Sequence, residues 1–338
     1  MVVTSVVSIR FLASRITNQL SCWWSYALSL FGIVRVRHLP TFVSIEPANL
    51  CQLRCPECPV GRRKNIPDDT HYLSLELFEK ILSEVQSTAH TIQFYFQGEP
   101  LLNECLPRMI TQARQVGLYT IVSTNAQALN KEMAHALVKS GLSRIIVSID
   151  GFSEEAYAAY RIGGSLHRAL AGLRFLRDSK DMLGSAIRIE LQVLRLRSNE
   201  HEWQWIRRNY KSLGATHLVF KTAQLYDYEH GHPLMPTNER YSRYKKQSDG
   251  TYRLHRFPFP FSVFRFWFTP CYRLWSGCVI TTTGEILPCC YDKAGEYAYG
   301  LLLNHSLASV WRNKKADEFR RQVIRDSNKI SICKECWH

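Results

Sequence analysis

Three cysteines early in the chain have the spacing of metal ligands. Cys51, Cys55 and Cys58 form a C-x3-C-x2-C motif. Thiolates are soft ligands that suit zinc, copper(I) or iron–sulfur clusters. Three thiolates leave a coordination position open, as a catalytic metal centre requires, whereas a structural zinc site is normally closed by four ligands. The motif therefore predicts a metal centre with an open position. A zinc knuckle completed by His71 is the alternative.

The elements that must position this motif are strands and helices that alternate from about residue 40. Strands are expected at 42–46, 91–96, 119–123, 144–149, 187–194 and 217–220. Helices are expected at 74–85, 106–116, 131–140 and 200–213, with further helical stretches from residues 153 and 166. Such β/α repeats predict an α/β fold with a parallel sheet, either open or curled into a partial (β/α)6 barrel. Chemistry in these folds lies at the C-terminal ends of the strands.

The composition excludes several protein classes. The chain has 338 residues, of which 46% are hydrophobic, and this favours about two domains with a large core over disorder. Eleven cysteines are many, but the odd count and the chain length disfavour a disulfide scaffold. The formal net charge of +14 indicates an anionic partner or surface.

The sequence around the cysteine motif, EPANLCQLRCPECP at 46–59, resembles the cluster loop of radical S-adenosylmethionine (SAM) enzymes. In that family three cysteines hold a [4Fe–4S] cluster, and SAM chelates the remaining iron through its amino and carboxylate groups. The resemblance implies that SAM is reductively cleaved to a 5′-deoxyadenosyl radical that abstracts hydrogen from a substrate. It also implies a reducing electron donor such as flavodoxin or ferredoxin.

Short motifs at the ends of the second, third and fourth expected strands, together with one arginine, resemble SAM-pocket segments of the same family. Taken alone, each of these motifs is an ordinary turn or strand end. The arginine resembles one that holds the SAM carboxylate in related enzymes. The resemblance implies that the residues that bind SAM are Gly98, Glu99, Pro100, Ser123, Asn125, Ser148, Asp150 and Arg161.

The C-terminal region resembles the SPASM/twitch module of the same superfamily. The resemblance implies an auxiliary [4Fe–4S] cluster held by four cysteines, namely Cys271, Cys289, Cys333 and Cys336. Cys289 fits the G-x4-C spacing from Gly284, and Cys290 is the alternative ligand. Because only two residues follow Cys336, the shorter twitch-like form with one auxiliary cluster is expected. A four-cysteine zinc site is the alternative. The remaining thiols, Cys22, Cys105 and Cys278, are expected to be buried.

A closed auxiliary cluster has no free iron, so it is expected to transfer electrons or to hold the C-terminal region in shape. The resemblance implies that it takes an electron from a substrate radical. Oxidising a C–H bond beside a heteroatom also needs a base. Lys221, at the end of the sixth strand, is the first candidate, because burial lowers the pKa of a lysine. His230 and His232 are alternatives, and an exposed strand end is the ordinary interpretation of Lys221.

The N-terminal segment has an apolar helical face. Apolar residues recur in steps of three or four from Ile9 to Val34, and four arginines flank the uncharged stretch: Arg10, Arg15, Arg35 and Arg37. Two interpretations stay open: a helix packed on the protein, or an in-plane membrane helix with Trp23 and Trp24 at the interface. The stretch is too polar for a full membrane span. It also lacks the small-residue cleavage site of a secretory signal.

A basic and aromatic segment lies between the two cysteine groups. Eight basic residues fall between positions 240 and 275, and six phenylalanines with Trp267 fall in 257–268. The segment could wall a pocket over the barrel mouth, contact an anionic membrane surface, or bind single-stranded nucleic acid by stacking. The pocket wall is preferred, the membrane comes second, and nucleic acid is disfavoured.

Four segments are expected: an amphipathic helix at 1–38, a radical SAM core at 39–225, a basic aromatic linker at 226–270 and a SPASM/twitch-like domain at 271–338. The expected activity is oxidation or cross-linking of a peptide or protein side chain. Alternatives are a small-molecule substrate, as for a dehydrogenase of a sugar or cyclitol alcohol, and a non-catalytic iron–sulfur or zinc-binding scaffold on a membrane. Thiolate ligation implies the cytoplasm, with peripheral attachment to the inner membrane surface as a further interpretation.

Overall fold

The computed structural model describes residues 2–63, 72–255, 271–334 and 336. The phenylalanine run at 257–268 and His71 lie outside the described residues. The helices are α1 (Val2–Ser29), α2 (Leu75–Val85), α3 (Leu106–Gln115), α4 (Lys131–Lys139), α5 (Glu154–Ala158), α6 (Leu166–Met182), α7 (Trp203–Asn209), α8 (Arg273–Ser276), α9 (Leu307–Trp311), α10 (Lys314–Asp326) and α11 (Ser331–Lys334). Short 3-10 helices are η1 (Pro100–Leu102), η2 (Arg197–Glu202), η3 (Glu239–Tyr241) and η5 (Ser327–Lys329).

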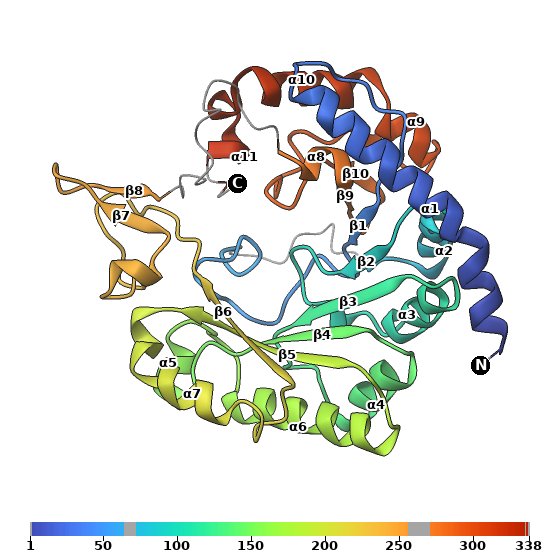
Figure 1. Cartoon of the computed structure of the whole chain (residues 1–338). Coiled ribbons are helices and arrows are strands. Elements are labelled where there is room, and N and C mark those ends of the chain that lie inside the picture. The colour runs from blue at the N-terminus through green and yellow to red at the C-terminus, as the bar shows by residue number, and fades with distance from the viewer. Residues whose placement is uncertain (1, 64–71, 256–270, 335, 337–338) are drawn as a thin grey trace.

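The strands of the main sheet are β1 (Phe42–Ile45), β2 (Thr91–Phe94), β3 (Tyr119–Thr124), β4 (Arg144–Ser148), β5 (Arg188–Arg195), β6 (His217–Thr222), β9 (Gly277–Ile280), β10 (Glu285–Leu287) and β11 (Gly300–Leu301). They lie in the order β11-β10-β9-β1-β2-β3-β4-β5-β6. From β1 to β6, each strand pairs in parallel with the next. The sheet curves, and α2, α3, α4 and α6 cover its outer side (Figure 1). The predicted α/β fold with parallel strands is confirmed.

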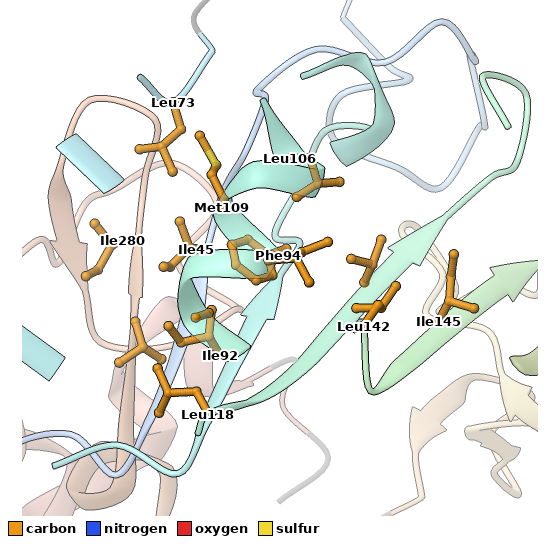
Figure 2. Packing of buried hydrophobic residues seen from close by; sticks show 14 of the residues in the cluster. Ile45, Leu73, Ile92, Phe94, Leu106, Met109, Leu118, Leu142, Ile145 and Ile280 are labelled. Carbon is orange, nitrogen blue, oxygen red and sulfur yellow. The ribbon is translucent and has the colours of Figure 1, made fainter. Parts of the chain in front are cut away.

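The core forms because apolar residues of the strands meet the apolar faces of these helices. Ile92 and Phe94 of β2 are fully buried, and Phe94 lies close to Leu106 and Met109 of α3 (Figure 2). Polar residues fix where the helices start. The Ser74 hydroxyl, for example, accepts the backbone N–H of Leu77 at 3.1 Å and caps α2. Packing and capping together hold the C-terminal ends of the strands in place.

The C-terminal region joins the sheet of the core. β9 pairs in parallel with β1, from Phe42 opposite Gly277 to Ile45 opposite Ile280, and β10 and β11 extend the sheet in antiparallel fashion. A Cβ at Gly277 would lie 2.7 Å from the carbonyl oxygen of Phe42, so glycine permits the close approach. The predicted boundaries near residues 225 and 270 stay predictions. The shared sheet nevertheless fixes the C-terminal cysteines relative to the core.

Helix α1 packs on the outside of the protein, beside α3 and α8 (Figure 1). The packed side of the helix is mostly polar but includes Cys22 and Tyr26, which join the core. The buried Arg15 guanidinium donates to the carbonyl groups of Gln86, Val116 and Gly117 at 2.7–3.1 Å, where α2 and α3 end. A cation at a helix C-terminus is favourable because the carbonyl groups there lack partners. Asn18 bonds both the N–H and the carbonyl of Leu39 at 2.9 Å.

The apolar side of α1 faces outward. Leu12, Ile16, Leu20, Trp23 and Trp24 are exposed, by 66% in the case of Trp24. An amphipathic helix packed on a protein is expected to bury its apolar face, and here the arrangement is reversed. The periodicity of the sequence identified the helix and its face. It could not show that arginine and asparagine would make the contacts with the body.

His38 lies where α1, the first strand and the C-terminal region meet. Its Nδ1 is 3.1 Å from the Ser25 hydroxyl, and its Nε2 is 2.6 Å from the carbonyl oxygen of Trp275. Burial lowers the pKa of His38 to about 4, and Arg320 and Arg312 add to the effect. The folded protein therefore holds a neutral imidazole that the unfolded chain protonates below pH 6.5.

Replacing His38 with glutamine should flatten the response of stability to acid. In the wild type, this histidine lowers the free energy of unfolding by about 1 kcal/mol between pH 7.5 and 5.5, because only the unfolded chain gains the proton. We expect the free energy of unfolding of H38Q to fall less over this pH range than that of the wild type. Denaturant unfolding of the anaerobic protein measures the difference. The control is H167Q, which removes an exposed histidine. An acid response of H38Q as steep as that of the wild type would contradict the prediction.

Candidate active site

The three motif cysteines lie in the loop that follows β1. Cys55 is buried, and Cys51 and Cys58 are half-buried. The sulfur of Cys51 accepts hydrogen bonds from the backbone N–H of Leu53 at 3.4 Å and from the side-chain amide of Asn125 at 3.3 Å. Burial raises the pKa of the Cys51 thiol to about 12, so it needs the positive charge of a metal to be a thiolate. Thiols with N–H donors aimed at sulfur suit an iron–sulfur cluster.

Glu99 connects the end of β2 with the end of β3. Its buried carboxylate accepts the hydroxyl of Thr124 at 2.6 Å and the backbone N–H groups of Asn125 at 2.8 Å and Leu101 at 3.1 Å. Burial, the largest influence, raises the pKa of Glu99. Because Asn125 in turn donates to Cys51, Glu99 positions a residue that contacts the cysteine loop.

Gly98 lies where this strand end packs against the cysteine loop. A Cβ at position 98 would lie 2.1 Å from the carbonyl oxygen of Ala48 and 2.6 Å from that of Leu50. The backbone N–H of Glu99 donates to the same Leu50 carbonyl at 2.8 Å. Glycine is required for this contact between backbones, and Pro100 then starts η1.

Arg161 and Asp150 form the other contact with the cysteine loop. Arg161 pairs with Asp150 at 2.6 Å, and its Nη1 lies 3.9 Å from the sulfur of Cys55. Burial alone would lower the pKa of Arg161, but the Asp150 carboxylate and the Cys55 thiol outweigh it and raise that pKa. The backbone N–H of Leu194 donates to the other Asp150 oxygen at 2.6 Å. The carboxylate therefore holds the guanidinium beside the loop.

Two predicted serines lie on the neighbouring strands. Ser123 is near the end of β3, and Ser148 is the last residue of β4, with the Gln192 amide 3.5 Å from its hydroxyl. The residues predicted to bind SAM thus share the C-terminal ends of β2, β3 and β4. The contacts of Asn125 and Arg161 bring this edge of the sheet to the cysteine loop.

The C-terminal cysteines come from three separate parts of the C-terminal region. Cys271 precedes α8, Cys289 follows β10, Cys333 lies in α11, and Cys336 follows that helix. Burial raises the pKa of both Cys271 and Cys289, in the latter case to about 12. The charge of Cys271 interacts with Cys336 and with Cys289, so these three thiols belong to one region of the protein.

Cys289 and Cys290 have different surroundings. Burial raises the pKa of Cys289 and the backbone of Tyr291 and Asp292 opposes this effect, while the Asp292 N–H donates to the Cys289 carbonyl oxygen at 3.3 Å. The sulfur of Cys290 lies 3.6 Å from Nη1 of Arg273. The charge of Cys290 also acts on Tyr95, which directly follows β2, and on Lys221 of β6. Of the remaining cysteines, Cys22 and Cys278 are buried as predicted, whereas Cys105 is only half-buried.

A cavity of about 480 Å³ lies between the core and the C-terminal region. We call it the inner cavity. Its lining includes Tyr95, which directly follows β2, Lys221 of β6, Arg273, Cys289 and Cys290. Burial lowers the pKa of Lys221, although Glu190 opposes the effect. The residue predicted as a base therefore faces the same space as two C-terminal cysteines.

The alternative bases lie elsewhere. His230 and His232 line a different cavity, of about 300 Å³, whose described lining does not include Lys221. His232 is 3.5 Å from Glu57, which belongs to the cysteine loop. His232 therefore contacts the loop from outside the inner cavity.

Lys293 and Glu46 are residues of this region that the sequence did not identify. The Lys293 ammonium lies 4.3 Å from the centre of the Phe96 ring. Burial lowers the pKa of Lys293. The charges of Cys290 and Cys58, one from each cysteine group, act to raise that pKa. Burial also raises the pKa of Glu46 to about 7. Lys293 lies in no motif, and only its place four residues after Cys289 could have signalled it. Glu46 directly follows β1, so its position at a strand end could have signalled it.

Two family models match the chain. Residues 45–184 match the radical SAM superfamily, and residues 271–337 match the SPASM iron–sulfur cluster-binding domain. The matched segments cover more than half of the chain and contain both cysteine groups. A radical SAM domain binds a [4Fe–4S] cluster and SAM, and a SPASM domain binds auxiliary iron–sulfur clusters.

Curated relatives resemble parts of the chain. The Fe-coproporphyrin III synthase of Methanosarcina barkeri is 29% identical over 43% of this chain and 36% of its own length. The PqqA peptide cyclase of Bradyrhizobium diazoefficiens is 26% identical over 82% of this chain and 74% of its own. The chain spans only about a third of the length of the first relatives that it matches.

The fold also resembles a solved structure. Streptococcus suis SuiB bound to S-adenosylmethionine superposes with a TM-score of 0.62 at 14% identity, over 88% of this chain and 72% of that one. Within the described residues, no three or more His, Cys, Asp or Glu side chains are close enough to hold a metal ion. The donor chemistry around Cys51 and Cys55 fits a multi-iron cluster, in which iron and sulfide lie between the ligands. The chain belongs to the radical SAM superfamily and carries a C-terminal SPASM iron–sulfur domain.

Proposed function

We propose that this protein is a radical SAM oxidoreductase that oxidises or cross-links a side chain of a peptide or protein. The observation that carries the proposal is the inner cavity, which brings Lys221 and the C-terminal thiols to the C-terminal ends of the core strands. The peptide class is supported by relatives named PqqA peptide cyclase, one of which aligns over 82% of this chain. The comparisons do not favour a sugar dehydrogenase or a non-catalytic scaffold.

Each group of residues would have its own role in the reaction. When bound at Cys51, Cys55 and Cys58, the cluster and SAM supply the 5′-deoxyadenosyl radical that removes a hydrogen atom from the substrate. Asn125 and Arg161 hold the cysteine loop through its sulfur atoms. Lys221 accepts the proton from the substrate. The cysteines at 271, 289, 333 and 336 hold the group that receives the remaining electron, and a flavodoxin or ferredoxin supplies the reducing electrons.

The function is tested by purifying the protein without oxygen and supplying SAM and dithionite. We expect about eight irons per chain, as two [4Fe–4S] clusters require, and formation of 5′-deoxyadenosine. Peptides encoded beside the gene would then be screened by mass spectrometry for loss of hydrogen. Bound zinc without SAM cleavage would support the scaffold and contradict the enzyme.

Replacing Lys221 with alanine should slow product formation by about a hundredfold or more, the contribution of a positioned general base. Cleavage of SAM should persist, because within the described residues no hydrogen bond or ion pair joins Lys221 to the cysteine loop. The measurement is the ratio of product to 5′-deoxyadenosine across a pH series. K211A, which removes an exposed lysine after α7, is the control. Full product yield from K221A would exclude Lys221 as the base.

We infer that helix α1 attaches the protein to an anionic membrane surface. Its outward face combines exposed leucine and isoleucine with Trp23 and Trp24, the residue type that prefers the membrane interface. Phe31 and Ile33 continue the apolar surface, being 81% and 49% exposed. Arg35 and Arg37 follow and are exposed, as electrostatic attraction to anionic lipid requires. Within the described part of the chain, every helix is too short or too polar to cross a bilayer.

Charged substitutions on this face should release the protein from vesicles. We expect the wild type to float with vesicles of mixed anionic and neutral lipid, and L20E/W24E to lose about tenfold in binding because apolar area no longer enters the bilayer. The control is T17E, a charged substitution at a polar exposed position of the same helix. Equal flotation of L20E/W24E and wild type would contradict the attachment, as would a wild type that stays in solution.

A further inference from the structure

A second and larger cavity lies on the other side of Lys221. We call it the outer cavity; its volume is about 790 Å³. It is lined mostly by β6 and by the residues between η3 and β8 (Tyr252–Leu254), and Lys221 lines both cavities. The described residues that line it are Arg195, Phe220, Lys221, Thr222, Glu239, Arg240, Ser242, Arg243, Tyr244, Lys245 and His255.

The charge of this lining is strongly unbalanced. It holds three arginines and two lysines against one carboxylate, that of Glu239. Among the described residues, no ion pair within 4.0 Å joins Arg195, Arg240 or either of the two lysines to a carboxylate. Cations of one sign repel one another unless a partner of opposite charge enters. The outer cavity is therefore complementary to an anionic ligand.

Arg195 shows that this arrangement is built into the fold. Its guanidinium lies over the rings of Tyr241 at 4.4 Å, Phe220 at 5.3 Å and Trp203 at 5.6 Å. Its Nε is buried without a hydrogen-bond partner among the described groups. The rings orient the planar guanidinium, and a guanidinium held in one plane suits a two-point contact with a carboxylate.

We propose that the outer cavity binds acidic side chains of the peptide substrate, so that the substrate is an acidic peptide. This inference rests on the proposed function and names the class of substrate. Carboxylates would bind Arg195, Arg240 and Lys245, and the chain of the peptide would continue past Lys221 into the inner cavity. Nucleic acid fits less well, because Arg195 already covers the rings of Phe220, Trp203 and Tyr241 on which bases would stack.

The test measures binding, which needs neither reductant nor turnover. Fluorescein-labelled hexaglutamate is titrated with the iron-loaded protein under anaerobic conditions and followed by anisotropy. Labelled hexalysine, a neutral serine–glycine hexapeptide and oligo-dT are titrated in parallel. We expect hexaglutamate to bind most tightly, with an affinity that falls as salt is added.

Two variants locate the binding. R240E/K245E reverses two exposed charges of the cavity and should weaken hexaglutamate binding by about tenfold or more. R195K keeps the charge but loses the planar fork, and should weaken binding by severalfold. R168E/K211E, which reverses one exposed charge on α6 and one after α7, should bind as the wild type does.

The proposal is overturned if hexaglutamate does not bind, if R240E/K245E and R195K both bind as the wild type does, or if oligo-dT binds more tightly than hexaglutamate. Formation of 5′-deoxyadenosine by the same preparation is measured separately. A preparation that cleaves SAM but fails to bind hexaglutamate refutes the acidic substrate and leaves the enzymatic function standing. A preparation that binds hexaglutamate without cleaving SAM refutes the function alone.

Discussion

Replacing Cys51, Cys55 and Cys58 together with alanine will abolish formation of 5′-deoxyadenosine and lower the iron content from about eight to about four per chain. The physical reason is that we assign these thiols as the ligands that leave an iron open to SAM, while the C-terminal set lies on other elements. Thiolate ligation cannot be replaced by alanine, so we expect the loss of activity to reach the detection limit. Iron and sulfide analysis and chromatography of the nucleoside products check it.

C105A is the matched control for this experiment. Cys105 is half-buried and lies outside both cysteine groups. It should keep the full iron content and the full rate of SAM cleavage, because the substitution removes a thiol without touching a ligand. A triple variant that still cleaves SAM, or one that loses all eight irons, would show that the two cysteine groups do not hold separate clusters.

The sequence was sufficient to predict the part of the fold that follows from periodicity. The six parallel strands and their helices appear where alternating apolar patterns and glycine stops indicated them, because burial of those patterns dominates the energetics of an α/β fold. The place of the cysteine loop after β1 followed from the same reasoning. Pairing of β9 with β1 could not be predicted, since it depends on contacts between residues more than two hundred positions apart.

The candidate site was predictable where a motif carries it and unpredictable where packing does. The sequence identified Asn125 and Arg161 by resemblance, but it could not show that Asn125 donates to Cys51 or that Asp150 holds Arg161. Lys293 is the clearer case. A single lysine four residues after Cys289 carries no pattern, and only the fold brings it close to Cys58 of the other cysteine group.

The same limit applies to α1. Arg15 and Asn18 look like the solvent-facing side of an amphipathic helix, because polar residues usually face water. Their contacts with Gln86, Val116 and Leu39 make them the packing side instead. Such a reversal depends on unpaired carbonyl groups at the ends of two other helices, which no local sequence pattern of α1 reveals.

Alanine at position 289 will remove the auxiliary cluster, and alanine at position 290 will not. The adjacent cysteines make a matched pair, since both substitutions delete one thiol from the same loop. The Cys289 thiol interacts with the backbone of Tyr291 and Asp292 and with the charge of Cys271, another predicted ligand, whereas the sulfur of Cys290 lies beside Arg273. We therefore expect C289A to hold about four irons and C290A about eight, measured on anaerobic preparations with electron paramagnetic resonance to count the reduced clusters.

The activities of the two variants should separate as well. C289A should still form 5′-deoxyadenosine but should yield almost no product, because the electron left on the substrate has no acceptor. C290A should cleave SAM normally and lose product only in part, since the Cys290 sulfur lies beside Arg273 at the inner cavity. The opposite pattern of iron contents would make Cys290 the ligand. Equal iron loss in both variants would mean that the loop collapses without either thiol, and C289S and C290S would then separate ligation from folding.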